Sequence, residues 1–279
     1  MRAIYATDLS AASEAAIENE TCLGCLDRIG IEAIHLVTVI PSNMHVGMPG
    51  MKYRERRQSG LDRYAGVMEA AGFDTETHIM RGKPFRRING LAESEAADVT
   101  IVGSRGQSPL ENRVIGSTAR NLSRTTVVPL LVNRIEREAE EPDVLREHLF
   151  QRVLYATDFS ENAERAFEAF SSLRHATQAA TLVHVESPKE PATDPPVADQ
   201  LAELESRLDQ WEIDTETQVR SGDPAEEILA AEEEVTPTTI LLGSKGQSRL
   251  RRLLLGSVSE TIIAEAASNV YIVPPPRTA

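Results

Sequence analysis

The apolar and polar positions of this chain form two kinds of segment that alternate along the sequence. Short, continuously apolar runs, such as residues 33–40 (Ala-Ile-His-Leu-Val-Thr-Val-Ile), have the length and the β-branched content of buried strands. Longer runs with apolar residues at helical spacing separate them. Because strands that are buried on both faces need helices on each side, this alternation predicts a parallel sheet covered by helices on both faces.

The first half of the chain contains one complete set of these segments. Ser10 is a good N-cap for the first helix, and Pro84 suits the first turn of the third, because a helix start leaves its first N–H groups unpaired. We expect strands at residues 2–7, 33–40, 74–80, 99–102 and 127–132, and helices at about 10–28, 53–71, 84–96 and from 117 onward. The same order of segments returns between residues 152 and 273.

The second half of the chain repeats motifs of the first. Residues 3–10 (Ala-Ile-Tyr-Ala-Thr-Asp-Leu-Ser) return as 153–160 (Val-Leu-Tyr-Ala-Thr-Asp-Phe-Ser). A repeat unit of this length is a whole domain. We therefore predict two tandem, doubly wound, Rossmann-like α/β domains with five-stranded parallel sheets, at residues 1–134 and 151–279, joined by an acidic linker at 135–150.

A spaced glycine motif is the strongest chemical signal in the sequence. Gly103 and Gly106 are followed, after nine residues, by Gly116 and Ser117, and the second half repeats this spacing with Gly243, Gly246, Gly256 and Ser257. Glycines after a strand let the backbone approach a ligand closely, and the Gly-Ser pair opens a helix whose N-terminal N–H groups favour phosphate. The alternative is a pair of glycine-rich turns that only cap the fold. Two copies with identical spacing favour a phosphate site.

These motifs resemble those of a known family. The glycine spacing resembles the G-2x-G-9x-G-(S/T) signature of the ATP-binding branch of the universal stress protein family, and the Ala-Thr-Asp-x-Ser opening at residues 6–10 fits it as well. Alanine stands in both copies where the family often has proline before the threonine. The resemblance covers nearly the whole chain, twice. It implies the adenine nucleotide alpha hydrolase-like fold, a role in the stress response, and ATP or AMP bound in each domain with Mg²⁺ as a companion ion.

The resemblance also implies roles for individual residues. In the first domain Ala6, Thr7 and Asp8 would line the adenosine end, Val39 would offer its backbone to adenine, Val102 and Gly103 would flank the nucleoside, and Gly106, Gly116, Ser117 and Thr118 would hold the phosphates. The matching residues of the second domain are Ala156, Thr157, Asp158, Val185, Leu242, Gly243, Gly246, Gly256, Ser257 and Val258. For Asp8 and Asp158 the alternative is a turn or N-cap role ahead of the serine two residues later.

The net charge of −14 is unevenly spread over the chain. Residues 1–134 carry a net charge of +1, the linker −4 and residues 151–279 −11. An acidic second half argues against a nucleic-acid surface. Since no signal peptide precedes the first strand and no apolar stretch approaches the roughly 18 residues of a membrane span, we expect a cytoplasmic protein without a membrane partner.

The two cysteines, Cys22 and Cys25, form a CxxC pair late in the first expected helix. They provide no disulfide framework, and no nearby histidine-rich segment completes a zinc site with them. We therefore expect them to belong to the core or to the helix surface, and we expect no metal site.

Three functions stay open on these grounds. The first is a nucleotide-binding regulatory protein without fast chemistry, the second is an enzyme such as a slow ATPase or another adenylate-handling activity, and the third is an interaction module that needs no nucleotide. The sequence has neither a GxxxxGK[ST] loop nor a GxGxxG, and no histidine is paired with a nucleophile at a telling spacing. We therefore favour the first function and expect no catalytic residues.

The last expected strand of each half, at 127–132 and 269–273, is apolar and would be an exposed sheet edge if it were left alone. Universal stress domains commonly dimerise through these strands. The resemblance therefore implies an intramolecular pseudo-dimer with two separate nucleotide sites. A further homodimer of the chain is compatible with the sequence but is not required by it.

Overall fold

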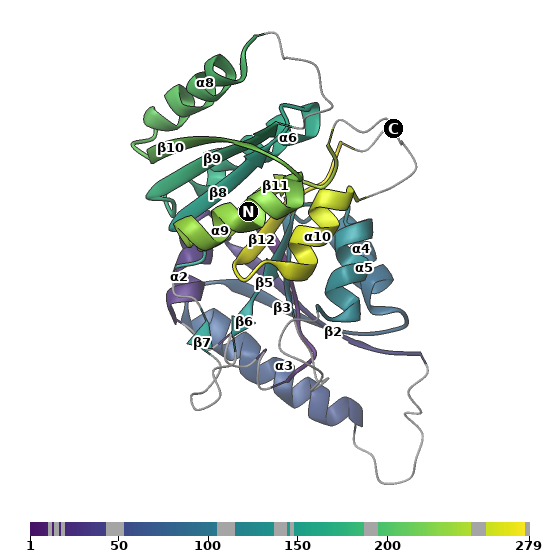
Figure 1. Ribbon diagram of the computed structural model, residues 1–279. Helices are drawn as coiled ribbons and strands as arrows, with labels where there is room; N and C mark the ends of the chain where they lie inside the picture. The colour runs from purple at the N-terminus through teal and green to yellow at the C-terminus, as the bar shows by residue number, and fades with distance from the viewer. Residues whose placement is uncertain are drawn as a thin grey trace. The chain divides into compact units, whose positions relative to one another are not determined.

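The structure, a computed structural model, describes residues 1–10, 13, 17, 20–42, 53–104, 115–136, 144–145, 148–186, 195–246 and 255–276. The chain divides into two compact units, Met1–Arg146 and Glu147–Ala279. Strands and helices alternate in both of them (Figure 1), which confirms the predicted α/β class with tandem, doubly wound sheets.

The first unit contains a five-stranded parallel sheet with the strand order β3-β2-β1-β4-β5. Its strands are β1 (Arg2–Ala6), β2 (Ala33–Ile40), β3 (Asp74–Arg81), β4 (Val99–Gly103) and β5 (Leu130–Asn133). Its helices, within the described residues, are α2 (Glu20–Arg28), α3 (Tyr53–Ala70), α4 (Pro84–Ser94) and α5 (Ser117–Thr125). Pro84 occupies the first turn of α4, as predicted.

The last strand of this unit begins later than the sequence predicts. We expected a strand over 127–132, whereas β5 covers Leu130–Asn133. The chain bends after α5, where the Thr126 hydroxyl donates to the Val128 carbonyl at 2.5 Å, and Pro129 has no N–H for a ladder. Pairing therefore starts at the Pro129 carbonyl, which accepts from the Thr100 N–H at 2.8 Å.

The second unit repeats this arrangement with the strand order β10-β9-β8-β11-β12, and all four neighbouring pairs are parallel. Its strands are β8 (Arg152–Thr157), β9 (Ala179–Glu186), β10 (Asp214–Ser221), β11 (Thr239–Gly243) and β12 (Asn269–Val273). Its helices are α6 (Glu161–Phe167), α7 (Phe170–Leu173), α8 (Val197–Asp209), α9 (Pro224–Val235) and α10 (Ser257–Glu265). Ser160 caps α6, because its hydroxyl accepts from the Ala163 N–H at 3.2 Å.

Part of the segment predicted as the linker has secondary structure. Two short strands, β6 (Ile135–Glu136) and β7 (Val144–Leu145), pair in antiparallel register and belong to the first unit. The unit boundary after Arg146 therefore lies near the end of the predicted linker, rather than at its start.

Helices cover both faces of each sheet. In the second unit α8 packs on β9 and β10, whereas α9 packs on the opposite face together with α10 (Figure 1). In the first unit α3 lies against β2 and β3, and α4 packs against β1, β2 and α5. Among the helices that the structure describes, none combines the length and the apolar composition that a bilayer crossing requires.

The core of the second unit includes an aromatic cluster around Tyr155. Its ring contacts those of Phe167 and Phe170 at centroid distances of 5.4 and 6.1 Å, and its hydroxyl donates to the Ala163 carbonyl at 2.7 Å. Burial raises the pKa of the Tyr155 phenol well above its ordinary value, and burial raises the pKa of Tyr5 in the first unit in the same way.

We therefore expect the free energy of unfolding to fall in strongly alkaline solution. Since the folded phenols have raised pKa values, the unfolded phenols ionise first; the stability from Tyr5 and Tyr155 is fully present below about pH 10 and is lost as the pH rises toward their folded values. Urea unfolding between about pH 8 and about pH 11 measures the decline. Tyr155→Phe should make the decline shallower, and an unchanged decline in this variant would argue against the assignment.

Candidate functional site

The two sheets each have one point where the strand order reverses, and both candidate sites lie there. In the first unit Ala6 at the end of β1 pairs with Val102 of β4, and in the second unit Ala156 of β8 pairs with Leu242 of β11. Strands on the two sides of this point connect in opposite directions, so the loops after them separate and leave a crevice. A cavity occupies this position in each unit.

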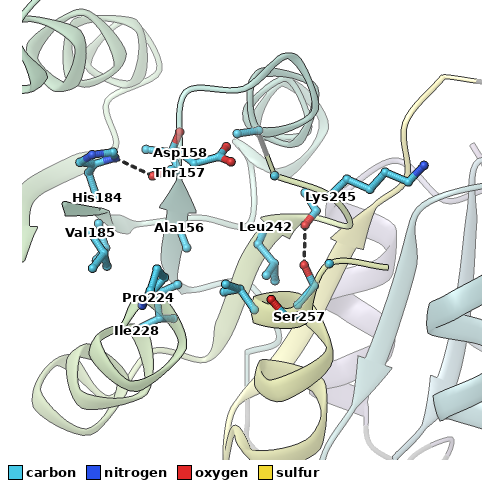
Figure 2. Close-up of a pocket in the computed structure, with 17 residues that line it drawn as sticks. Ala156, Thr157, Asp158, His184, Val185, Pro224, Ile228, Leu242, Lys245 and Ser257 are labelled. Atoms are coloured by element: carbon cyan, nitrogen blue, oxygen red, sulfur yellow. Dashed lines mark hydrogen bonds between the residues drawn. The ribbon is translucent and has the colours of Figure 1, made fainter. Parts of the chain in front are cut away.

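The cavity of the second unit has a volume of about 410 Å³. Figure 2 shows its lining side chains, which come from the ends of β8, β9 and β11 and from the first turns of α9 and α10. All ten residues that the sequence predicts for this site line the cavity: Ala156, Thr157, Asp158, Val185, Leu242, Gly243, Gly246, Gly256, Ser257 and Val258.

The cavity of the first unit is smaller, at about 290 Å³. Nine of the ten predicted residues line it: Ala6, Thr7, Asp8, Val39, Val102, Gly103, Gly116, Ser117 and Thr118. The tenth, Gly106, lies outside the described residues, as does the whole segment 105–114.

Backbone hydrogen bonds hold the two ends of each glycine loop together in the same way. In the second unit the Gly256 N–H donates to the Ser244 carbonyl at 2.7 Å, and the Ser244 N–H donates to Val273 at 2.9 Å. In the first unit Gly116 donates to Ser104 at 2.8 Å, and Ser104 donates to Asn133 at 2.7 Å. Each loop therefore leaves β4 or β11 and returns to the start of α5 or α10, where the first N–H groups of the helix have no helical partner.

The glycines of the motif are needed for space rather than for unusual backbone angles. None of Gly243, Gly246 and Gly256 has a positive φ. A Cβ on Gly246 would lie 2.5 Å from Oδ2 of Asp158, and one on Gly243 would lie 2.9 Å from the Asn162 carbonyl oxygen. For Gly256, the nearest atom to an added Cβ is the Ser244 carbonyl oxygen at 3.6 Å, so the described part of the loop leaves that space open to a ligand.

The two aspartates combine the predicted position with a local turn. Oδ1 of Asp8 accepts from the Ser10 N–H at 3.0 Å and from the Ser13 hydroxyl at 3.0 Å, and Oδ1 of Asp158 accepts from the Ser160 N–H at 3.1 Å. Both aspartates therefore make the local turn contacts that were the alternative prediction for them. It does not exclude a ligand contact, since both side chains also line the cavities.

Several lining residues do not appear among the sequence predictions. Pro224 and Ile228 of α9 cover the side of the second cavity, and Pro84 and Ile88 of α4 do the same in the first. The signal that was available is the proline at the first helical turn together with an apolar residue four positions later.

One position on the second strand of each unit, β2 or β9, has different residues in the two units. His184 lies on the second cavity, donates from Nδ1 to the Thr157 carbonyl at 2.9 Å and stacks on Phe159 at 4.7 Å. Thr38 is its counterpart in the first unit and accepts a hydrogen bond from the buried Arg57 guanidinium, which lines that cavity. The two sites are therefore similar in backbone and different in the polar groups on one wall.

The sequence profile of the universal stress protein family matches residues 1–134 and 149–274. The chain belongs to the universal stress protein family. A universal stress protein of Mycolicibacterium smegmatis is 24% identical to it over 294 residues, which cover 98% of this chain and 96% of that protein. The crystal structure of a universal stress protein from Archaeoglobus fulgidus is similar with a TM-score of 0.74 and 26% identity, and the match covers 98% of both chains.

Shorter relatives match only part of this universal stress protein. Stress response protein NhaX of Bacillus subtilis is 36% identical over 73 residues, which are 26% of this chain and 44% of that protein. The matched region thus spans about half the length of this relative. A universal stress protein solved in complex with cAMP covers 48% of this chain at 20% identity and a TM-score of 0.37.

Proposed function

We propose that each unit binds one adenine nucleotide (ATP, ADP or AMP) in its cavity, with Mg²⁺ beside the phosphates, and that the chain is a cytoplasmic regulatory protein of the stress response. One observation carries the proposal: in both units, motif residues that are distant in sequence line a single cavity at the carboxyl ends of the strands. This is the position at which doubly wound sheets bind their ligands.

The walls of the second cavity suit the two ends of a nucleotide. Val185, Ile228 and Leu242 supply an apolar surface for a planar base, and the Asp158 carboxylate can accept hydrogen bonds from ribose hydroxyls. Gly246, Gly256 and Ser257 lie where the loop meets the start of α10, a nine-residue helix. Its unpaired N–H groups and positive dipole end favour phosphate, and Lys245 adds a cation.

The residues that line the cavities favour nucleotide binding over fast catalysis. Neither cavity contains a histidine, cysteine or serine that is hydrogen-bonded to a general base among the described side chains, apart from the Ser13 hydroxyl, which donates to Asp8 within a turn. A slow ATPase remains the alternative, because a bound Mg·ATP can be attacked by water without a protein nucleophile. An interaction module that needs no nucleotide is the second alternative.

One experiment separates these three functions. The chain is purified without added nucleotide and denatured, and the supernatant is examined by ultraviolet absorbance and mass spectrometry for ATP, ADP, AMP and cAMP. Phosphate release from added Mg·ATP is then measured. The proposal predicts an adenine nucleotide in the supernatant, or one that can be loaded, and no phosphate release above background. Steady turnover would support the enzyme, and no retention or loading would support the interaction module.

The pairing of the two units through their last strands stays a prediction. It depends on β5 and β12, in which every residue except Asn133 and Asn269 is apolar. Hydrogen exchange of their backbone amides, as slow as that of β1 and β8, is the result expected for edges that are covered.

A further inference from the structure

Two imidazoles and a carboxylate cluster on the sheet of the first unit, outside the nucleotide cavity. His35 is on β2, and Glu76 and His78 are on β3. Glu76 pairs in register with His35, and residues two apart on a strand share a face, so all three side chains lie on the same side of the sheet. His35 is 7% exposed, His78 is half-buried and Glu76 reaches solvent.

The donor atoms of these side chains lie at the separations of metal ligands. His35 Nδ1 is 3.1 Å from His78 Nε2 and 3.7 Å from Glu76 Oε2, and His78 Nε2 is 3.9 Å from Glu76 Oε1. Tetrahedral Zn²⁺, with bonds of about 2.0–2.1 Å, places its ligand atoms about 3.3 Å apart. One ligand atom from each of the three residues lies within 4.8 Å of the others, so the exposed Glu76 side chain has to move closer to the two imidazoles to complete a triangle of ligands.

A second carboxylate, that of Glu95, lies beside the other ring nitrogen of His35, Nε2. Oε2 of Glu95, the residue that caps the C-terminus of α4, is 3.9 Å from His35 Nε2. The Glu95 carboxylate thus lies on the Nε2 side of the ring, opposite to Nδ1, which faces His78 and Glu76. A carboxylate behind a ligating histidine is the usual outer partner in zinc sites. The Glu95 backbone carbonyl accepts from the Arg2 guanidinium at 2.5 Å, so Arg2 is the cation nearest to this end of α4 among the described contacts.

The second unit shows that the fold does not need this cluster. The register pair that corresponds to His35 and Glu76 is Thr181 and Glu216, and Gln218 corresponds to His78. The same strands therefore form with one carboxylate and no imidazole at these positions. A shared proton between His35 and His78 is the metal-free explanation of their 3.1 Å contact, but it gives no role to Glu76 or Glu95.

We propose that His35, Glu76 and His78 bind one divalent transition-metal ion of the Zn²⁺ type, with water as the fourth ligand and Glu95 as the outer partner of His35. Two imidazole nitrogens and one carboxylate select Zn²⁺, Co²⁺ or Ni²⁺ over Mg²⁺ and Ca²⁺, which take oxygen ligands. This site does not depend on nucleotide binding.

The test is a metal titration of the full chain in the absence of nucleotide. The protein is stripped with a chelator and titrated with Zn²⁺ against a chromogenic competitor, and Co²⁺ is used as a spectroscopic probe. We expect one Zn²⁺ per chain and the Co²⁺ absorption of a four-coordinate nitrogen and oxygen site. His78→Gln, which copies the second unit, and Glu76→Gln should weaken binding by at least about 100-fold, since loss of an outer partner alone costs about 10–100-fold. Glu95→Gln should fall in that lower range.

Two controls make the outcome decisive. His175→Gln removes an exposed histidine outside the cluster and should leave Zn²⁺ affinity unchanged. Cys22→Ser combined with Cys25→Ser should also retain it. Thermal unfolding in chelator establishes that the variants are folded, and Glu76 is exposed enough to be replaced safely even if His78→Gln is unstable. No stoichiometric Zn²⁺ binding at micromolar concentration, binding that survives both His78→Gln and Glu76→Gln, or loss of binding only in the cysteine variant would overturn the proposal.

Discussion

Gly256→Val should abolish nucleotide binding in the second unit and leave the fold of that unit intact. Gly256 is the N-cap of α10 with φ −75° and ψ 155°, a conformation that valine adopts readily. Among the atoms of the described residues, the nearest to a Cβ there is the Ser244 carbonyl oxygen at 3.6 Å. The side chain would instead occupy the space in front of the first N–H groups of α10, where the phosphates are expected to lie. Affinity should become weaker than about 1 mM, a binding free energy of about −4.1 kcal/mol.

Calorimetry on the variant measures this effect directly. Gly116→Val is the corresponding change in the first unit, and each variant should retain the other site. Gly24→Val is a suitable control, because Gly24 is an exposed helical glycine with open space around its Cβ position. Nucleotide binding at full stoichiometry in Gly256→Val, with an unchanged circular dichroism spectrum, would show that the phosphates lie elsewhere.

Glu232→Ala should destabilise the second unit strongly. Glu232 of α9 is buried, and its carboxylate accepts from the Ala267 N–H at 3.2 Å and from the Ser268 N–H at 2.5 Å, in the turn between α10 and β12. Alanine would leave the buried Ser268 N–H without this acceptor, whereas Ala267 is exposed and its N–H can donate to water instead. An orphaned buried donor costs about 1–3 kcal/mol, so we expect a loss of about this size in the free energy of unfolding.

Urea unfolding of matched variants tests this role. Glu233→Ala removes the neighbouring carboxylate, which is exposed, and should change the free energy of unfolding by less than about 0.5 kcal/mol. The first unit has Ala92 at the position of Glu232, so its own turn is held differently, by the Thr126 hydroxyl. Equal stability of the Glu232 and Glu233 variants would show that solvent or another group satisfies the Ser268 N–H.

Sequence periodicity predicted the sheet elements well because most strands, such as β2, β4 and β11, are buried on both faces. The run at 33–40 matches β2 residue for residue, and the glycine and Ala-Thr-Asp motifs follow strands whose ends meet at one edge. The start of β5 was wrong because the apolar residues Val127 and Val128 read as strand, whereas a side-chain hydrogen bond and Pro129 bend the chain there. The strands β6 and β7 in the predicted linker were missed, since two-residue strands carry no periodic signal.

The remaining features of the sites depend on contacts between distant residues. His35 and His78 are 43 residues apart, and nothing in their local sequence indicates that their rings meet. The register of β2 against β3 brings them together, and single-sequence patterns do not specify register between strands. In the same way, Glu232 reads as a solvated charge on an acidic helix until the turn after α10 is placed against it.

Calorimetric titration of the full chain with Mg·ATP tests the central proposal most directly. The account predicts two bound nucleotides per chain, reduced to one by Gly256→Val or by Gly116→Val and to none by both together. ADP and AMP should compete for the same sites. No heat of binding for ATP, ADP or AMP at millimolar concentration, with protein whose fold is verified, would contradict it.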